Sequence, residues 1–480
     1  MSGSFIAPLA TVLGASESGT RLLLSLLSGY PLALLYRSSL LYNQPPAVKH
    51  VYFIMTGLLQ CWFNFGTDVY HSMFNITFIY ILLRVAGGTK FSAVFAFFFN
   101  LTYLVVGYYY EVVSGKEYNI SWTMPHCVLT LRLTAVAFDL YDGHKTPIPP
   151  AYKETALTKA PSLLELFGQC YFFGGFLVGP QYSMRRYMNF VNGEYSDPKT
   201  KGPPNTVMPA LERFLLGIAY IGAYQAVYIF VSDEFLQSEA FQERGLLLKC
   251  VLLIIWGKTC LHKYIGSWLL TEGAIIFCGL SYNNLDENKQ PLWDGCTNVR
   301  VKLLETGCTL QHAIRSFNCN TNLWMAQYIF KRLRFLGNKL VSQAVTLFYL
   351  AIWHGQDTGY FINFFLEFIY TMCERQIAST VERIGPLRQF FGIPALQPVL
   401  FVVKKIYSTF LLSFALVGFS LLQYSKWNGV YASLHYVGFV IPALLLSACT
   451  FLQFMFPSKS EHNGVTSSSP SKSQTSQKSD

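Results

Sequence analysis

Apolar runs about as long as a bilayer is thick recur along the whole chain, separated by short polar breaks. A membrane-spanning helix needs about 20 mainly apolar residues. We expect spans near residues 20–37, 50–66, 68–86, 91–111, 122–140, 210–231, 246–261, 264–282, 340–356, 358–374, 400–424 and 433–456. The pattern predicts an all-α polytopic membrane protein of roughly 10–12 transmembrane helices, packed as one domain over residues 1–456.

Two stretches depart from this pattern. Residues 161–182 are apolar but rich in glycine. They form either a re-entrant or kinked segment that lines a central cavity or an ordinary interfacial helix, because broken backbone at membrane depth must be covered by protein or water. Residues 283–339 are too aromatic and basic for a disordered loop and are expected to form short interfacial helices. Residues 457–480 are rich in Ser, Lys and Gln and are expected to be a disordered tail.

Composition supports lipid as the surrounding solvent. The 480 residues are 52% hydrophobic and 13% charged, whereas soluble proteins average about 25% charged residues. The net charge of +10 fits either basic cytosolic loops or an anionic ligand. Basic residues gather in 142–160, 183–209 and 331–339, which we expect on the cytosolic side, and acidic residues gather in 232–244. We expect membrane lipid and no nucleic acid as partners.

Several catalytic and metal-binding classes lack their motifs in this chain. The nine histidines lie more than fifteen residues apart, which excludes clustered histidine boxes and HExxH zinc sites. GxSxG, Walker and GxGxxG motifs are missing, and the eleven cysteines form no CxxC pair. We therefore predict no bound metal.

The chain contains three glycosylation sequons. Asn75 and Asn100 of two sequons fall inside predicted spans, whereas Asn119 of a third lies near a loop.

Residues 313–366 concentrate the candidate chemistry. An Asn-rich patch that includes Asn318 and Asn322 precedes a basic cluster, and the following apolar run ends in Trp353, His354 and Gly355. An ionisable group within a span is a functional candidate, and a neutral imidazole can act as a general base. The structural alternative is a histidine that forms a hydrogen bond between helices. Position alone leaves both open.

The strings SFNCNTNLWMAQYIFKRLRFLGNK and LFYLAIWHGQDTGYF resemble the signature region of the membrane-bound O-acyltransferase superfamily, and within it the lysophosphatidylcholine acyltransferase subfamily. MPHCVLTLRL, PSLLE, FLVGPQYSM, IIWGK and WLLTEG extend the similarity over about 120–430. The resemblance implies that His354 and Asn318 form the catalytic site. Gln356-Asp357 departs from the family pattern, in which Leu and a His-like residue are expected.

The resemblance also implies the activity. We expect an acyl-CoA-dependent 1-acylglycerophosphocholine O-acyltransferase of the endoplasmic reticulum, which remodels phospholipids with polyunsaturated chains. It implies lysophosphatidylcholine as the main acceptor, lysophosphatidylethanolamine and lysophosphatidylserine as lesser ones, and acyl-CoA as a co-substrate, with no cofactor. It leaves a homodimer open. The alternatives are another acceptor on the same fold, namely a sterol, a diacylglycerol or a protein, or a lipid transporter without catalysis.

Further residues are candidates for substrate contact. Lys331, Arg332 and Arg334 would bind the phosphates of acyl-CoA, or alternatively mark an interface with anionic lipid headgroups. The candidates for the substrate cavity are the aromatic and amide side chains of Trp324, Trp353 and Asn322. For Trp324, packing in the core or at the membrane interface is the alternative.

Overall fold

The computed structural model describes residues 5–114 and 120–457, and its regular elements within these ranges are helices. The first half contains α1 (Ala7–Leu13), α2 (Glu17–Tyr36), α3 (Ser39–Tyr42), α4 (Pro46–Phe65), η1 (Gly66–Asp68), α5 (Val69–Ala86), α6 (Lys90–Val113), α7 (Thr123–Gly143), η2 (Pro150–Tyr152), α8 (Leu163–Tyr171) and α9 (Met184–Val191). The middle of the chain forms α10 (Val207–Tyr228), α11 (Asp233–Gln237), α12 (Glu239–Gln242) and α13 (Leu246–Cys278).

Short elements precede the last group of long helices. They are α14 (Val301–Thr306), α15 (Leu310–Ser316), α16 (Cys319–Tyr328) and η3 (Phe330–Leu336). The chain then forms α17 (Lys339–His354), α18 (Thr358–Arg383), α19 (Gly385–Phe391), η4 (Pro394–Leu396), α20 (Gln397–Leu421), α21 (Tyr424–Ser433) and α22 (Val437–Met455). The prediction that 283–339 folds as short helices is confirmed for residues 301–336, whereas residues 283–300 form no helix and contain an isolated antiparallel bridge between Leu285 and Pro291. Their position relative to the membrane interface stays a prediction.

The all-helical polytopic prediction is confirmed, with one correction. The spans expected at 246–261 and 264–282 are a single helix of 33 residues, α13. Lys258, His262 and Lys263 do not interrupt it, because no proline is present to break its hydrogen bonds and Lys258 is paired with Glu305. Among the described residues, five helical stretches are long and apolar enough to cross a membrane, so the total of 10–12 spans stays a prediction.

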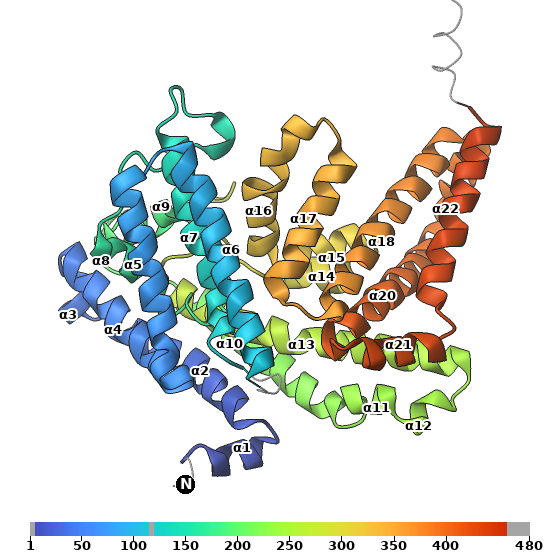
Figure 1. Ribbon diagram of the computed structural model, residues 1–480, viewed down its shortest axis with the longest axis horizontal. Coiled ribbons are helices and arrows are strands. Elements are labelled where there is room, and N and C mark those ends of the chain that lie inside the picture. The colour runs from blue at the N-terminus through green and yellow to red at the C-terminus, as the bar shows by residue number, and fades with distance from the viewer. Residues whose placement is uncertain (1–4, 115–119, 458–480) are drawn as a thin grey trace, which may run out of the picture.

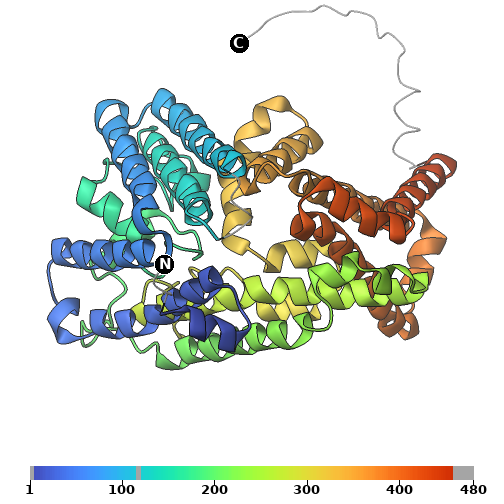
Figure 2. The ribbon, with the colours of Figure 1, turned by 60° about the horizontal axis from the view of Figure 1, so that its bottom comes forward.

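Helix α13 joins the two halves of the molecule. It packs against α2 on one side and α20 on the other, and α10 lies along it (Figures 1 and 2). Gly217 of α10 and Gly266 of α13 allow this close approach. A Cβ on Gly266 would lie 2.5 Å from the side chain of Ile221, and one on Gly217 would lie 3.0 Å from that of Leu270. Small residues at a helix crossing let two backbones approach within the bilayer, where van der Waals packing drives association.

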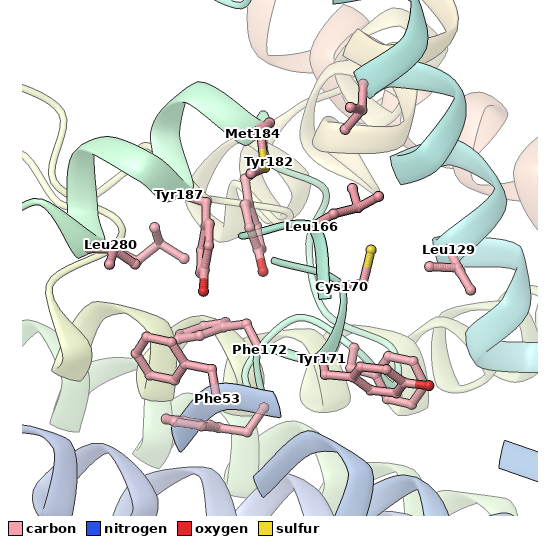
Figure 3. Packing of buried hydrophobic residues seen from close by; sticks show 14 of the residues in the cluster. Phe53, Leu129, Leu166, Cys170, Tyr171, Phe172, Tyr182, Met184, Tyr187 and Leu280 are labelled. Carbon is pink, nitrogen blue, oxygen red and sulfur yellow. The ribbon is translucent and has the colours of Figure 1, made fainter. Parts of the chain in front are cut away.

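The glycine-rich stretch 161–182 is broken after one short helix. A capping box between Ser162 and Glu165 begins α8, which ends at Tyr171, and residues 172–183 continue without helix. Phe172 is fully buried, with its ring 4.9 Å from that of Phe53 (Figure 3). Residues 177–181 line a large cavity. The kinked, cavity-lining interpretation is confirmed, and the interfacial-helix alternative is wrong.

Buried Arg132 of α7 holds this broken backbone in place. Its guanidinium donates to the carbonyl oxygens of Gln169 and Cys170, both at 3.1 Å, and to that of Gly175 at 2.9 Å. Arg132 is 1% exposed. Carbonyl groups that leave a helix inside an apolar bundle need internal donors, because no water is available to bond them.

The basic segments contact one another at one end of the molecule. Arg332 of η3 pairs with Asp142, Gln327 donates to the hydroxyl of Thr155, and Arg185 donates to the carbonyl oxygen of Ala156. Helices α11 and α12, which carry the acidic segment 232–244, lie at the opposite end (Figure 1). This arrangement agrees with the predicted division of the loops between two sides. Which side is cytosolic stays a prediction.

The structure describes two of the three glycosylation sequons. Asn75 is 1% exposed and Asn100 is fully buried, so neither amide is accessible to a glycosyltransferase. The Asn119 sequon and residues 458–480 of the predicted tail lie outside the described residues.

Replacing Arg132 with Met should destabilise the fold. The change removes three charge-assisted hydrogen bonds and leaves three buried carbonyl groups without these donors, so we expect a loss of about 2–4 kcal/mol in the free energy of unfolding. The control is Arg84→Met, because Arg84 is exposed on α5. The melting temperature of purified protein in detergent measures both. Equal melting temperatures for the two variants would contradict the assigned role of Arg132.

Candidate active site

Helix α17 ends at His354. Asn338 caps the beginning of the helix by accepting from the backbone N–H of Leu340 at 2.9 Å. Gly355 ends it with a φ of 154°, and a Cβ there would lie 2.6 Å from the ring of Tyr360. Glycine is therefore required at 355 for the chain to leave the helix and begin α18. The histidine is left on the last turn, facing inward.

His354 lies among four aromatic rings. Its imidazole is nearly parallel to the rings of Tyr360 and Phe364, at centroid distances of 5.6 and 5.3 Å. It meets the rings of Phe419 at 5.0 Å and Trp353 at 4.6 Å edge to face. Within residues 5–114 and 120–457, no hydrogen bond engages its ring nitrogens. The structural alternative, a histidine bonded between helices, therefore finds no partner in the described part of the chain.

Trp353 fixes the same turn of α17. Its indole N–H donates to the carbonyl oxygen of Cys127 at 2.9 Å, and its own carbonyl oxygen accepts from the hydroxyl of Tyr108 at 2.8 Å. These bonds tie the end of α17 to α6 and α7. They hold the neighbouring imidazole in a defined position, as a catalytic group requires.

Asn318 precedes α16 in a left-handed backbone conformation, with φ 50° and ψ 46°. Asparagine is among the few residues that tolerate this region, which is often strained at functional sites. The following N–H, of Cys319, donates to the carbonyl oxygen of Asn298 at 2.9 Å. Asn322 stabilises the backbone before Asn318 by donating to the carbonyl oxygens of Ile314 and Phe317 at 2.8 and 2.9 Å. The Asn318 side chain caps no helix.

A buried carboxylate supports the loop around Asn298. Glu272 of α13 is 1% exposed and accepts from the backbone N–H groups of Asn298 and Val299 at 2.7 and 2.9 Å. Arg213 of α10 lies 3.7 Å from its other oxygen. Sequence reasoning assigned no role to Glu272 or Asn298. The available signal was the string WLLTEG, in which Glu272 is a charge inside an apolar run.

One cavity of about 1810 Å³ brings the candidate residues together. His354, Asn318, Asn322 and Trp353 all line it. Its volume exceeds the 300–1,000 Å³ typical of small-molecule pockets, as a site for lipid chains requires. The wall also contains polar side chains that the sequence analysis missed, namely Asn363, Glu367 and Thr371 at four-residue spacing on α18 and Lys263 on α13.

Trp324 does not line this cavity. Its indole N–H donates to the carbonyl oxygen of Leu131 at 2.9 Å, its ring stacks on Tyr349, and the side chain is 4% exposed. The core-packing alternative is therefore the one observed, and the prediction of a cavity residue is wrong. A buried indole needs an acceptor, and a carbonyl group of α7 supplies it.

The basic cluster also lies away from the cavity. Lys331, Arg332 and Arg334 belong to η3 and are not among the residues that line the cavity wall. The guanidinium of Arg332 donates to the fully buried carboxylate of Asp142 at 2.6 Å and lies 4.2 Å over the ring of Phe138. Arg332 is thus paired within the protein, and its predicted contact with the phosphates of acyl-CoA stays a prediction. Contact of Lys331 and Arg334 with a ligand outside the cavity stays a prediction.

Cys319 adjoins Asn318 but is unsuited to nucleophilic catalysis. Its thiol donates to the carbonyl oxygen of Arg315 at 3.3 Å, and the side chain is buried. Burial raises the pKa of this thiol above its ordinary value. Because the thiolate is the reactive form, a raised pKa disfavours attack by this sulfur.

The profile of the membrane-bound O-acyltransferase family matches residues 107–417. The chain is 41% identical to Lysophospholipid acyltransferase 5 of Mus musculus, over 94% of this chain and 92% of that protein. It is 39% identical to Lysophospholipid acyltransferase 5 of Drosophila melanogaster, over 91% and 88%. Lysophospholipid acyltransferase of Schizosaccharomyces pombe is 26% identical, over 89% and 85%.

Replacing Arg332 with Gln should lower stability more than it alters ligand binding. The change leaves Asp142 buried with only Lys145 as an ionic partner. We expect a loss of about 1–3 kcal/mol, less than the 3–5 kcal/mol for breaking an isolated buried pair, because Lys145 remains. Arg334→Gln is the matched control, because Arg334 is exposed on the same short helix. Thermal unfolding of the two purified variants measures the difference. An Arg332→Gln protein that melts at the same temperature as the Arg334→Gln protein would contradict the stabilising role of the Arg332–Asp142 pair.

Proposed function

The chain belongs to the membrane-bound O-acyltransferase family, and we propose that it transfers a fatty acyl group from acyl-CoA to the free hydroxyl of a lysophospholipid. It is a multi-pass membrane acyltransferase, so the lipid-transporter alternative is set aside. The single observation that carries the proposal is the placement of His354 and Asn318 on the wall of one large cavity. The relatives are lysophospholipid acyltransferases by name, and this supports the acceptor class.

The proposed reaction is direct transfer within the cavity. His354 takes the proton of the lysophospholipid hydroxyl, and the oxygen attacks the thioester carbonyl of acyl-CoA. A carbon–oxygen bond forms, the carbon–sulfur bond breaks, and the imidazolium returns its proton to the departing CoA thiolate. An imidazole whose nitrogens are not engaged by described protein groups is available for this shuttle.

Asn318 has the chemistry to assist in one of two ways. Its amide N–H can donate to the oxyanion that develops on the thioester carbonyl, or its amide group can orient the imidazole. The left-handed backbone at 318 and the bonds of its two neighbours hold the residue at the cavity wall. Such preorganisation means that little reorganisation is needed during the reaction. No acyl-enzyme is required, in agreement with the buried, weakly acidic thiol of Cys319.

The finer assignments extend the same proposal. The acceptors are lysophosphatidylcholine foremost, then lysophosphatidylethanolamine and lysophosphatidylserine, and the donors are polyunsaturated acyl-CoAs. The similarity of the signature strings to the lysophosphatidylcholine acyltransferase subfamily supports them. The membrane is that of the endoplasmic reticulum, where phospholipid remodelling would place such an enzyme. Homodimer formation stays a prediction.

Replacing His354 with Ala should lower kcat about 10²- to 10⁴-fold, which is the usual contribution of a general base. Asn318→Ala should lower it about 10²- to 10³-fold, by analogy with the loss of an oxyanion donor. The measurement is release of free CoA by purified protein given acyl-CoA and a panel of lysophospholipids, a sterol, a diacylglycerol and an acceptor peptide.

The matched controls are His435→Ala and Asn288→Ala, which remove exposed side chains of the same types. Both should retain turnover near that of the wild type. Turnover by the wild type with the sterol, the diacylglycerol or the peptide but with no lysophospholipid would overturn the acceptor class. Near-full turnover by His354→Ala would overturn the assignment of the base alone.

A further inference from the structure

Lys263 is a lysine on the cavity wall, in the middle of α13. Its Nζ lies 5.1 Å from the centre of the Tyr264 ring. In residues 5–114 and 120–457, no hydrogen bond or salt bridge engages this ammonium group. An ionisable side chain within a membrane helix is unfavourable without a partner, so such a residue points to a function.

Three other cations inside the described part of the protein are partnered. Arg132 bonds three carbonyl oxygens, Arg332 pairs with Asp142, and Lys249 donates to the carbonyl oxygen of Ser433 at 3.0 Å. The described residues lining the cavity include two lysines and no arginine, and the second lysine, Lys426, is exposed. Lys263 is therefore the partly buried cation of the cavity wall, placed where a ligand can reach it.

Lys263 lies on the same wall as the candidate catalytic residues. The ring of Tyr264 meets that of Phe419 at 6.2 Å, and Phe419 packs against His354. One turn further along α13, Trp268 meets Phe317 at 5.0 Å, directly before Asn318. A headgroup held by Lys263 and a hydroxyl facing His354 can thus belong to one molecule in one cavity.

We propose that Lys263 binds the phosphate of the acceptor lysophospholipid and thereby places its free hydroxyl toward His354. This inference rests on the proposed function. A phosphodiester carries the anionic oxygens that an ammonium group binds most strongly, and the low dielectric of the cavity strengthens the pair. The same group would not recognise an uncharged acceptor such as a monoacylglycerol.

The phosphates of CoA are the competing source of this anion, and the position of Lys263 favours the lipid. Asp233, the first residue of α11, accepts from the hydroxyl of Ser420 at 2.8 Å, and the thiol of Cys260, three residues before Lys263 on α13, lies 3.9 Å from the same hydroxyl oxygen. Figure 1 shows α11 at the end of the molecule opposite to the basic segments, which are expected on the cytosolic side where CoA arrives. Lys263 therefore lies on the α11 side of the cavity, away from the predicted entry of CoA.

The surroundings of Lys263 suit the cationic end of a zwitterionic headgroup. Asp233 and the rings of Tyr224 and Tyr228, which are 5.0 Å apart, all line the cavity. Asp233 is held by the indole N–H of Trp256 and the hydroxyl of Ser420, both at 2.8 Å. A quaternary ammonium group is attracted both by a carboxylate and by aromatic faces. The wall thus offers one positive and one negative group, as a phosphocholine does.

The test is Lys263→Met, assayed for both substrates. We expect the KM for lysophosphatidylcholine to rise about 10- to 100-fold, which corresponds to the loss of one charged hydrogen bond. The KM for acyl-CoA should stay within about twofold. Lys263→Arg should keep the KM for lysophosphatidylcholine close to the wild-type value, since a guanidinium also binds phosphate. Lys404→Met is the matched control and should leave both values unchanged, because Lys404 is an exposed lysine of α20 that does not line the cavity.

A binding measurement keeps the inference independent of turnover. Radiolabelled lysophosphatidylcholine and monoacylglycerol are titrated onto wild type, Lys263→Met and Lys263→Gln in nanodiscs, with melting temperatures recorded. Selective loss of lysophosphatidylcholine affinity at an unchanged melting temperature supports the proposal. Binding without turnover by the wild type would contradict the proposed function and leave this assignment standing.

Three results would overturn the role of Lys263. The first is unchanged lysophosphatidylcholine affinity in the Lys263→Met protein. The second is a rise in KM confined to acyl-CoA, which would assign the lysine to the phosphates of CoA. The third is an equal loss of affinity for both lipids, or unfolding of Lys263→Met and Lys263→Gln while Lys263→Arg keeps the melting temperature but not the affinity. Either outcome would make the residue structural.

Discussion

The rest of the structure depends on one constraint, namely that polar groups inside an apolar helical bundle must find partners within the protein. Arg132 meets it by bonding the carbonyl groups of the broken segment after α8. Because that segment can leave the helical conformation without unpaired carbonyl groups, residues 177–181 are free to line the cavity. The cavity therefore exists where it does partly because a single arginine is buried beside it.

The same constraint connects α13 to the candidate active site. Glu272 binds two backbone N–H groups of the loop at 298–299, and the carbonyl oxygen of Asn298 accepts from the N–H of Cys319. The left-handed turn at Asn318 is thus held through the backbone, and its own amide needs no part in that support. This division leaves the side chain of Asn318 for substrate while buried neighbours maintain the local geometry.

Hydropathy was sufficient to predict the long helices, because an apolar run of sufficient length has few alternatives in a membrane. It failed at α13, where the polar residues 258–263 suggested a break. Charged side chains alone do not end a helix, because its backbone hydrogen bonds stay intact in the absence of proline. The signature strings predicted His354 and Asn318 as the catalytic pair, and both residues line the cavity. The strings could not reveal that Arg332 is paired with Asp142, 190 residues earlier, or that the indole of Trp324 bonds to Leu131. Long-range partners of this kind are set by tertiary packing, which local patterns do not encode.

The length of α13 has a mechanical consequence. At 1.5 Å per residue, its 33 residues extend for about 50 Å, whereas the hydrocarbon layer is about 30 Å thick. A helix this long either tilts within that layer or extends beyond it. Because it packs against α2 at one side and α20 at the other, it connects the two halves through one continuous element. Lys263 of this helix lines the cavity, so the helix that connects the two halves also forms part of the cavity wall.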